Sequence, residues 1–372
     1  MKFICEKLPL LVAIITASHA TASKSPVQVL EGLLIEADEE NVRITGYDLK
    51  TGIVTTVPAE VKETGALVLN ARLFGEIIRK APGQYISITV NSGFVAAINS
   101  ELSEYEILGY PPTDYPELPS VEGSESIEIS EALLKKMISQ TKFAVSDNES
   151  RPIHTGALFE AGAGMLTIVA VDGFRLALRR EPLEGGDIHN TSFVVPGTAL
   201  DELLKIISDG DGKVSIMPGS KHILFSIGDT LLISRKLEGE FLNYKSSIPQ
   251  TAKYQIKVVK DELISAVERV SLIINEKLKS PIKCIFGDGV VKMSAASALG
   301  KANDECVIDG NGEDLEIGFN DRYLLEALKA APAGDVIVGL STGISPCIIY
   351  PADESSHFVY MILPVRLKPY ES

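Results

Sequence analysis

Few stretches of this 372-residue sequence bring together side chains that could do chemistry. The stretch DGDGK, residues 209–213, resembles the beginning of a calcium-binding loop, but the acidic residues that would complete such a loop are missing downstream. Because it follows an expected helix, a turn that ends the helix explains it better. The four cysteines are scattered, with no Cys-x-x-Cys pair and no histidine at metal-ligand spacing, so we expect reduced thiols.

The sequence also lacks the common catalytic motifs. It has no G-x-x-x-x-G-K-[ST] phosphate loop, no strand-coupled G-x-G-x-x-G, no H-E-x-x-H and no G-x-S-x-G. With five histidines, a hydrolase would have to be assembled without any familiar arrangement of nucleophile and base. We therefore expect a protein that is not an enzyme and that needs no metal or cofactor.

The net charge and its distribution along the chain give opposite indications about a nucleic-acid partner. The net charge of −15 argues against a nucleic-acid partner. The segments expected to be helical nevertheless carry +3 together, while the rest of the chain carries −18. This distribution suits helices that face a polyanion and sheets that face water, although ordinary helix faces with paired charges would explain it as well.

Three similar segments recur along the chain and predict the elements that position any site. They read LNARLFGEIIRKAP, VPGTALDELLKIIS and FNDRYLLEALKAAP, and their common glutamates are 126 and 124 residues apart. Each segment predicts an amphipathic helix. The second has an apolar stripe and an i, i+3 pair of Glu202 and Lys205 on its wetter side. The apolar stripe of this second helix consists of Leu200, Leu203, Leu204 and Ile207. In the first and third helices, Asn70 and Asn320 are the expected N-caps.

A second helix recurs in EKLPLLVAII, SEALLKKMIS and KDELISAVER, which align through Leu8, Leu133 and Leu263. In the first copy the spacing predicts a core-facing stripe. The stripe consists of Leu8, Leu11, Val12 and Ile15. An alternative interpretation is that residues 1–20 form a secretory signal peptide ending in Ser-His-Ala, in which case the protein would be an exported β-rich ligand-binding protein. The repeat favours the helix, because both later copies retain this element.

Between the helices the apolar period changes to two. Ile86, Ile88 and Val90 share one face before a turn at residues 91–93, and residues 212–237 predict three short strands. Two stretches without either period fall near one-third and two-thirds of the chain. We therefore expect an α+β fold of three similar domains, each with two helices packed on antiparallel sheets. Their expected boundaries are 1–122, 123–250 and 251–372. No apolar run approaches the ~20 residues that span a bilayer, so no membrane contact is expected.

A succession of motifs resembles the bacterial DNA polymerase III beta subunit, the sliding clamp. The motifs are ESRPIHTGALFE, TIVAVDGFRLALRR, KLEGEFLNYKSSIP, NEKLKSPIKC, GFNDRYLLEAL, SPCIIYP and LPVRL. The resemblance covers essentially the whole chain and implies a head-to-tail homodimeric ring around double-stranded DNA, with helices lining the hole. It also implies a cytoplasmic processivity factor for replication that binds the DNA polymerase III catalytic subunit, the clamp loader and other proteins with clamp-binding motifs.

The resemblance further implies a groove for a short partner peptide between the second and third domains. Such a groove is mostly apolar with a few polar groups, and suits an extended peptide with Leu or Phe anchors. By position in the motifs it would comprise His154, Thr155, Val171, Gly173, Phe174, Arg175, Leu176, Leu242, Ser247, Asn320, Tyr323, Ile344, Pro346, Leu363, Pro364, Val365 and Arg366. Ordinary core packing is the alternative explanation for most of its apolar members.

The sequence departs from the family pattern at several positions. Phe174 stands where the family usually has His, which should make the floor of the groove more apolar. Leu242 replaces a usual Pro, Ser246-Ser247 replace a basic and apolar pair, and Gly197-Thr198 lack a frequent lysine. The expected DNA-binding residues are Lys24, Arg72, Arg79, Asn148 and Arg151. The chain also continues beyond the usual end, so Lys368 to Ser372 either cover the groove part of the time or form a tail without effect.

Overall fold

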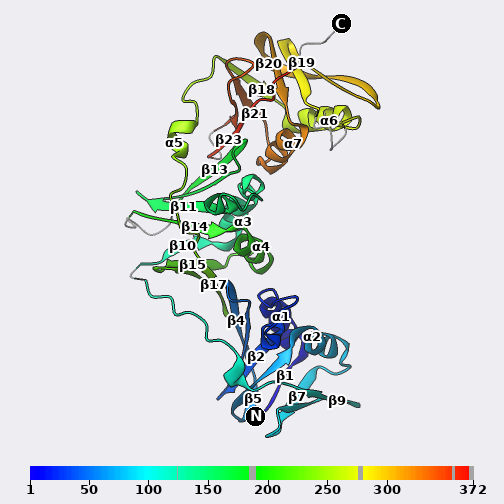
Figure 1. The fold of residues 1–372 in the computed structure, drawn as a ribbon, viewed down its shortest axis with the longest axis vertical. Helices are drawn as coiled ribbons and strands as arrows, with labels where there is room; N and C mark the ends of the chain where they lie inside the picture. Colours follow the sequence, from blue (N-terminus) through cyan, green and yellow to red (C-terminus); the bar gives the residue numbers. More distant parts are fainter. Residues whose placement is uncertain (124, 184–189, 275–279, 354–356, 368–372) are drawn as a thin grey trace. The chain divides into compact units, whose positions relative to one another are not determined.

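The computed structural model describes residues 1–123, 125–183, 190–274, 280–353 and 357–367. The chain forms two compact units, drawn as a ribbon in Figure 1. The first unit contains Met1–Lys135 and Thr198–Lys236, and the second contains Lys136–Gly197 and Leu237–Ser372.

The first unit contains two antiparallel sheets. The smaller has the strand order β5-β1-β7-β8-β9, which leaves β9 at an edge. Its strands are β1 (Lys2–Glu6), β5 (Glu60–Glu63), β7 (Tyr85–Val90), β8 (Val95–Ser100) and β9 (Ser103–Leu108). The larger has the order β10-β15-β16-β17-β4-β3-β2-β6. Its strands are β2 (Gly32–Asp38), β3 (Asn41–Tyr47), β4 (Thr51–Pro58), β6 (Gly65–Asn70), β10 (Ile127–Ser130), β15 (Lys213–Pro218), β16 (His222–Ile227) and β17 (Thr230–Arg235). In the larger sheet β17 pairs with β4, so strands far apart in the sequence share one sheet.

Helices α1 (Lys7–Ser18) and α2 (Ala71–Lys80) lie side by side in the first unit (Figure 1). The unit also contains short 3₁₀ turns at Gln28–Glu31 and Pro112–Asp114, and most of α4 (Gly197–Ile206). The stripe expected on α4 is confirmed in that Leu200, Leu203 and Ile207 are buried, while Leu204 is only partly so. The expected pair is also present, with Lys205 Nζ 2.9 Å from Glu202 Oε1.

The stripe predicted on α1 is wrong. Leu8 is 71% exposed, Val12 is 63% exposed and Ile15 is 41% exposed. The buried residues of this helix are instead Leu10, Ala13, Ile14 and Ala17. The residues that correspond in the three helices are Leu10, Leu134 and Leu263, because each is the fourth residue of its helix and each is buried. The alignment through Leu8 and Leu133 is therefore shifted from the structural one.

Close backbone packing explains which face of α1 is buried. A Cβ atom on Gly46 of β3 would lie 2.0 Å from the carbonyl oxygen of Ala17. The helix therefore approaches the sheet so closely that small side chains must face it. Ala13 and Ala17 provide that face, whereas the larger Leu8, Val12 and Ile15 remain outside.

The second unit contains one ten-stranded antiparallel sheet in the order β14-β11-β12-β13-β23-β22-β21-β18-β20-β19. Its strands are β11 (Gly156–Gly162), β12 (Met165–Val171), β13 (Arg175–Pro182), β14 (Thr191–Pro196), β18 (Tyr254–Val258), β19 (Ile282–Ser297), β20 (Gly300–Phe319), β21 (Val336–Leu340), β22 (Cys347–Pro351) and β23 (Phe358–Ile362). Pairing of β13 with β23 joins the middle and the end of the chain.

Helices of the second unit include α6 (Lys260–Ser271) and α7 (Asp321–Ala330), which lie side by side (Figure 1). The short α5 (Tyr244–Ser247) and 3₁₀ turns at Lys142–Ala144 and Pro152–Thr155 also belong to this unit. Helix α3 (Glu131–Ser139) is divided between the units, which meet in the sequence after Lys135. The expected combination of helices with antiparallel sheets is thus confirmed. Within the described residues, no helix is long and apolar enough to cross a membrane.

All four cysteines are buried free thiols. Burial raises the pKa of Cys5 and of Cys284 to about 12. Since the thiolate is the reactive form, these two side chains are unreactive members of the core.

The predicted cap of α2 is confirmed, because the amide of Leu73 donates to Asn70 Oδ1 over 3.0 Å. Replacing Asn70 by Ala is expected to lower the free energy of unfolding by about 1 kcal/mol, since one N–H at the helix start loses its acceptor. Urea denaturation checks this value. Asn70→Asp keeps an acceptor oxygen and should retain most of the stability. Equal losses in both variants would show that the cap bond contributes little.

Candidate functional site

The turn between β12 and β13 forms the centre of the expected groove. Asp172 Oδ1 accepts hydrogen bonds from the amides of Phe174, at 2.9 Å, and Arg175, at 3.0 Å. Gly173 has φ +92°, a left-handed conformation that glycine adopts without strain. This turn places the Phe174 side chain at its tip, where it is 58% exposed. Phe174 therefore lies at the surface of this turn, and its place at the floor of the groove stays a prediction.

Arg175, which follows this turn, is only 6% exposed and has two acidic partners. Its Nε donates to Asp172 Oδ2 over 2.8 Å, and its Nη1 donates to Glu326 Oε2. The guanidinium carbon lies 4.4 Å from the ring centroid of Tyr323 and 5.4 Å from that of Phe143. Ion pairs and ring faces thus surround the buried cation on several sides.

Glu326 on α7 is held in its ionised form. Its partial burial alone would raise the pKa, but hydrogen bonds from Arg175 and Arg322 outweigh burial and lower it. Arg322 Nε donates to Glu326 Oε1 over 2.8 Å. Because the pKa of Glu326 is below its usual value, the pairs with both arginines are maintained at neutral pH.

Phe174 and Tyr323 form a stacked pair that connects the β12–β13 turn with α7. The ring centroids are 6.1 Å apart and the ring planes differ by 25°. The amide of Tyr323 donates to Asn320 Oδ1 over 3.1 Å, which confirms the predicted cap of this helix. The amide of Leu363, just after β23, donates to the carbonyl of Phe174 over 2.8 Å. The predicted groove residues that lie together around this turn are Gly173, Phe174, Arg175, Asn320, Tyr323 and Leu363.

A second, apolar cluster lies beside this turn. Val171 and Leu176 pack in it with Tyr244 and Met361. Partly buried side chains that extend the cluster are Ile153, Leu178, Leu237, Phe241 and Ile248.

The ring of His154 contacts Phe241 edge-on, with centroids 5.5 Å apart. Burial and the nearby charge of Arg151 lower the pKa of His154, so the imidazole is mostly neutral at pH 7. Leu242, next to Phe241, is exposed.

The remaining predicted residues lie around these two clusters. Thr155 Oγ1 donates to the carbonyl of Pro152, and Ser247 Oγ donates to that of Asn243. Pro346 directly precedes β22, whose Cys347 is paired with Ile362. Ile344 is an exposed residue of the loop before β22. Pro364, Val365 and Arg366 follow Leu363 along the chain, and the Val365 amide donates to Gly318.

Sequence reasoning missed several residues that contact the predicted groove residues. Phe143 contacts Arg175 from a 3₁₀ turn distant in sequence, and nothing in its own neighbourhood signalled this role. Glu326 was recognised only as a repeated helix residue. Asp172 lies within the quoted motif VDGFR, where an acidic residue before glycine is typical of a turn.

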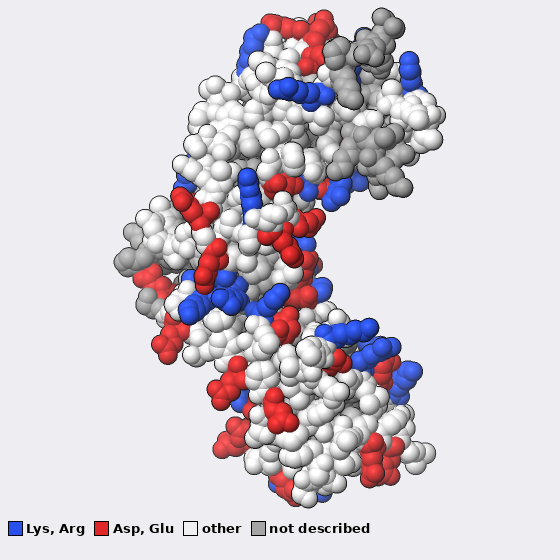
Figure 2. Space-filling view, viewed as in Figure 1, with Lys and Arg blue, Asp and Glu red and all other residues white. Residues whose placement is uncertain are grey.

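The predicted DNA-binding residues are divided between the two units. Lys24 is exposed after α1, and Arg72 and Arg79 are exposed on α2, about 10 Å apart along the helix axis. Arg79 Nη1 lies 2.6 Å from Glu76 Oε1. Asn148 and Arg151 belong to the other unit. Figure 2 shows Lys and Arg side chains interspersed with Asp and Glu over the face drawn. The extension Lys368 to Ser372 lies outside the described residues.

Three family models match consecutive parts of the chain. They describe the N-terminal, central and C-terminal domains of the DNA polymerase III beta subunit, and match residues 1–119, 128–243 and 245–366. A beta sliding clamp of Halalkalibacterium halodurans is 34% identical over 362 residues, which cover 94% of this chain and 95% of the relative. Another of Staphylococcus epidermidis is 34% identical over 357 residues, with 93% and 94% covered.

Solved structures give the same result. The DNA polymerase sliding clamp of Bacillus subtilis matches with a TM-score of 0.95 and 32% identity, covering 99% of this chain and 100% of that one. The expected alternative, an exported ligand-binding protein, finds no support in these matches. The matches span nearly the whole chain and each of its three repeats, so the chain belongs to the family of bacterial DNA polymerase III beta subunits, the non-catalytic sliding clamps.

Proposed function

We propose that two copies of this chain close a ring around duplex DNA and tether the replicative polymerase to it. The observation that carries this proposal is the series of three beta-subunit domains that match residues 1–119, 128–243 and 245–366 in order. The ring holds DNA by enclosing it, which is compatible with a net charge of −15, because topological retention needs little direct affinity. The protein acts in the cytoplasm, where the bacterial chromosome lies.

Ring closure requires surfaces at which two chains can join. The edge strand β9 belongs to the first unit, and the edge strand β19 belongs to the second. A free strand edge offers unpaired backbone groups to another chain. Leu108, at the end of β9, is strongly exposed and would be covered in a head-to-tail pair.

The groove around Phe174 is the proposed docking site for a short peptide of the polymerase, the clamp loader and other partners. Its two clusters combine apolar surface with an ordered set of polar groups. The exposed Phe174 ring offers a face to an aromatic or leucine side chain of the peptide. The proposed DNA contacts are the basic residues named above, and Arg72 is a candidate on α2. The domain boundaries 1–122, 123–250 and 251–372 remain predictions.

A retention assay tests the function. The protein is loaded on nicked circular DNA by a clamp loader with ATP, and is then followed by gel filtration before and after the circle is cut. We expect it to stay on the intact circle and to leave the linear molecule by sliding off the ends. Equal loss from both forms, or nanomolar binding to a blunt 20-mer at physiological salt, would overturn the proposal.

A further inference from the structure

One face of the sheet around β11, β12 and β13 changes in character along the strands. Val171 lies opposite Leu176 at the end near the groove. The next side chains on the same face are apolar, with Val169 opposite Leu158 and Leu178. The following row is polar. In it, Glu160 lies opposite Ser192 and Thr167, and Thr167 lies opposite Arg180. This sheet face is therefore apolar near the groove and polar further along the strands.

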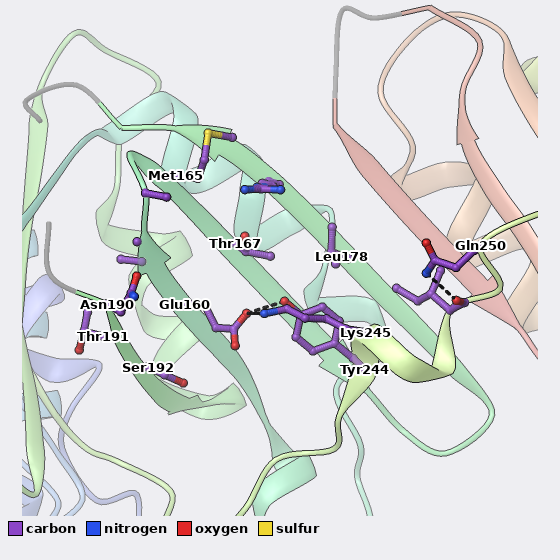
Figure 3. Close-up of a pocket in the computed structure, with 15 residues that line it drawn as sticks. Glu160, Met165, Thr167, Leu178, Asn190, Thr191, Ser192, Tyr244, Lys245 and Gln250 are labelled. Carbon is purple, nitrogen blue, oxygen red and sulfur yellow. Dashed lines mark hydrogen bonds and ion pairs between the residues drawn. The ribbon is translucent and has the colours of Figure 1, made fainter. Parts of the chain in front are cut away.

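A strap formed by residues 241–250 contacts this face. Tyr244 is buried in the apolar cluster that contains Val171 and Leu176 of the groove. Its hydroxyl donates to Glu160 Oε2, and Lys245 Nζ lies 3.3 Å from the same oxygen. Figure 3 shows these side chains turned toward Glu160. The strap is thus attached at once to the groove cluster and to the polar row.

A cavity of about 670 Å³ opens over the polar row, bounded on one side by the strap. Tyr244, Lys245 and Ile248 of the strap line it, as do Glu160, Thr167 and Arg180 of the sheet. Its volume lies within the range of roughly 300 to 1,000 Å³ that is typical of small-molecule sites. None of the residues predicted for the groove lines this cavity.

The lining indicates the class of ligand. Arg180 and Lys245 contribute positive charge, while the carboxylate of Glu160 already accepts from Tyr244 and pairs with Lys245. An anionic group is therefore the favoured polar partner. Met165, Leu178 and Ile248 offer apolar surface in the same cavity. A ligand that satisfies both parts carries a carboxylate next to an apolar group.

We propose that this cavity is a second binding site, for an amphipathic carboxylate, and that it acts on the peptide groove through Tyr244. An incoming carboxylate competes with Glu160 for Lys245 and loosens the attachment of the strap. Because Tyr244 also packs against the groove cluster, peptide affinity falls when the cavity is filled. The coupling rests on the proposed function of the groove, whereas the site itself does not.

Binding to the cavity can be measured without any peptide partner. The probe is N-acetyl-L-phenylalanine, and the matched control is its uncharged amide. We expect the acid to shift the methyl resonance of Met165 in the intact protein with saturation, and the amide to do so at least about tenfold more weakly, as the loss of one charge-assisted contact implies. Arg180→Gln should abolish the difference, while Lys221→Gln, in the other unit, should preserve it. A Met165 signal that responds equally to the acid and to its amide overturns the site.

The same carboxylate chemistry has two sources, a free small molecule or an acidic residue of a protein segment. A blocked peptide, acetyl-Gly-Asp-Leu-Gly-amide, is compared with N-acetyl-L-phenylalanine. Saturable binding of either probe that depends on Arg180 supports the site, and the stronger of the two identifies the source. If neither binds, the proposal fails.

Coupling is tested with a fluorescent clamp-binding peptide, with and without saturating probe. We expect the probe to weaken peptide binding about fivefold, within the usual range of coupling between sites. Tyr244→Phe, which lacks only the hydroxyl, should reduce that effect to less than about twofold. Probe binding that leaves peptide affinity unchanged overturns the coupling. Failure of the peptide to bind without probe instead counts against the proposed groove.

Discussion

Replacing Arg175 by Ala is expected to lower the free energy of unfolding by about 3 to 5 kcal/mol, and to abolish binding of a clamp-binding peptide. The guanidinium is buried and neutralises both Asp172 and Glu326. Without it, Asp172 loses this cation and Glu326 keeps only Arg322. Tyr323 also loses the cation against its ring, so its stacking with Phe174 is no longer fixed. Urea denaturation and fluorescence anisotropy of the peptide measure the two effects.

Two matched variants keep this prediction testable if the alanine variant fails to fold. Arg175→Lys retains the charge but cannot span both carboxylates and stack on the rings, so it should fold and bind peptide weakly. Arg322→Ala removes the other, largely exposed, partner of Glu326 and should cost less than about 1 kcal/mol. Similar losses from Arg175→Ala and Arg322→Ala would contradict the role of the buried cation.

Much of the fold was predictable because local signals agreed with the final packing. Asn70 and Asn320 cap their helices as expected, since an acceptor side chain before an apolar period satisfies free amides. The turn at residues 91–93 was also predictable, because Asn91 Oδ1 accepts from the amides of Gly93 and Val95. Each of these features depends on neighbours in the sequence.

The face of α1 was not predictable in the same way. Its segment is apolar almost all round, so two stripes with the same spacing were available. Periodicity favoured the one with larger side chains, Leu8 to Ile15. Packing against Gly46 selected the one with Ala13 and Ala17. The buried face is thus set by a glycine in a strand about 30 residues away in the sequence. The sequence of the helix itself holds no information about that glycine.

The predicted groove residues also differ in whether neighbouring sequence could identify them. The motif VDGFR contains the turn, its glycine and Arg175, so these residues could be named together from sequence. Phe143 and Tyr323 meet Arg175 only because β13, α7 and a 3₁₀ turn are adjacent in the second unit. Tyr323 was found through family resemblance. Phe143 belonged to no quoted motif and was missed.

The exposed apolar face of α1 has a consequence for the proposed ring. If helices line the hole, this helix presents Leu8, Val12 and Ile15 toward DNA and offers phosphates no charged partner there. The one lysine of α1, Lys7, donates to the carbonyl of Ala81. In the proposed ring, DNA would therefore slide past α1 without forming ion pairs with it.

Changing Leu8, Val12 and Ile15 together to Lys is expected to raise the affinity for a 30-bp duplex by about 100-fold at 0.15 M salt. Each new phosphate contact contributes roughly fivefold at this concentration, because counterions are released from DNA. The slope of log affinity against log salt should steepen by up to about 2.7 for three contacts. The side chains are already exposed, so little core packing is lost. Fluorescence anisotropy between 0.05 and 0.2 M salt measures both quantities.

A charge-matched control separates position from net charge. Thr64 is exposed and directly precedes Gly65, the first residue of β6. Gly65 lies next to Met1, so Thr64 is at the far end of β1 and β6, the strands that lead into α1 and α2. Val12→Lys alone should therefore tighten DNA binding about fivefold, whereas Thr64→Lys should change it by less than about twofold, since a charge remote from the phosphates releases few counterions. If both single variants tighten binding equally, the gain comes from net charge, and α1 does not face the DNA.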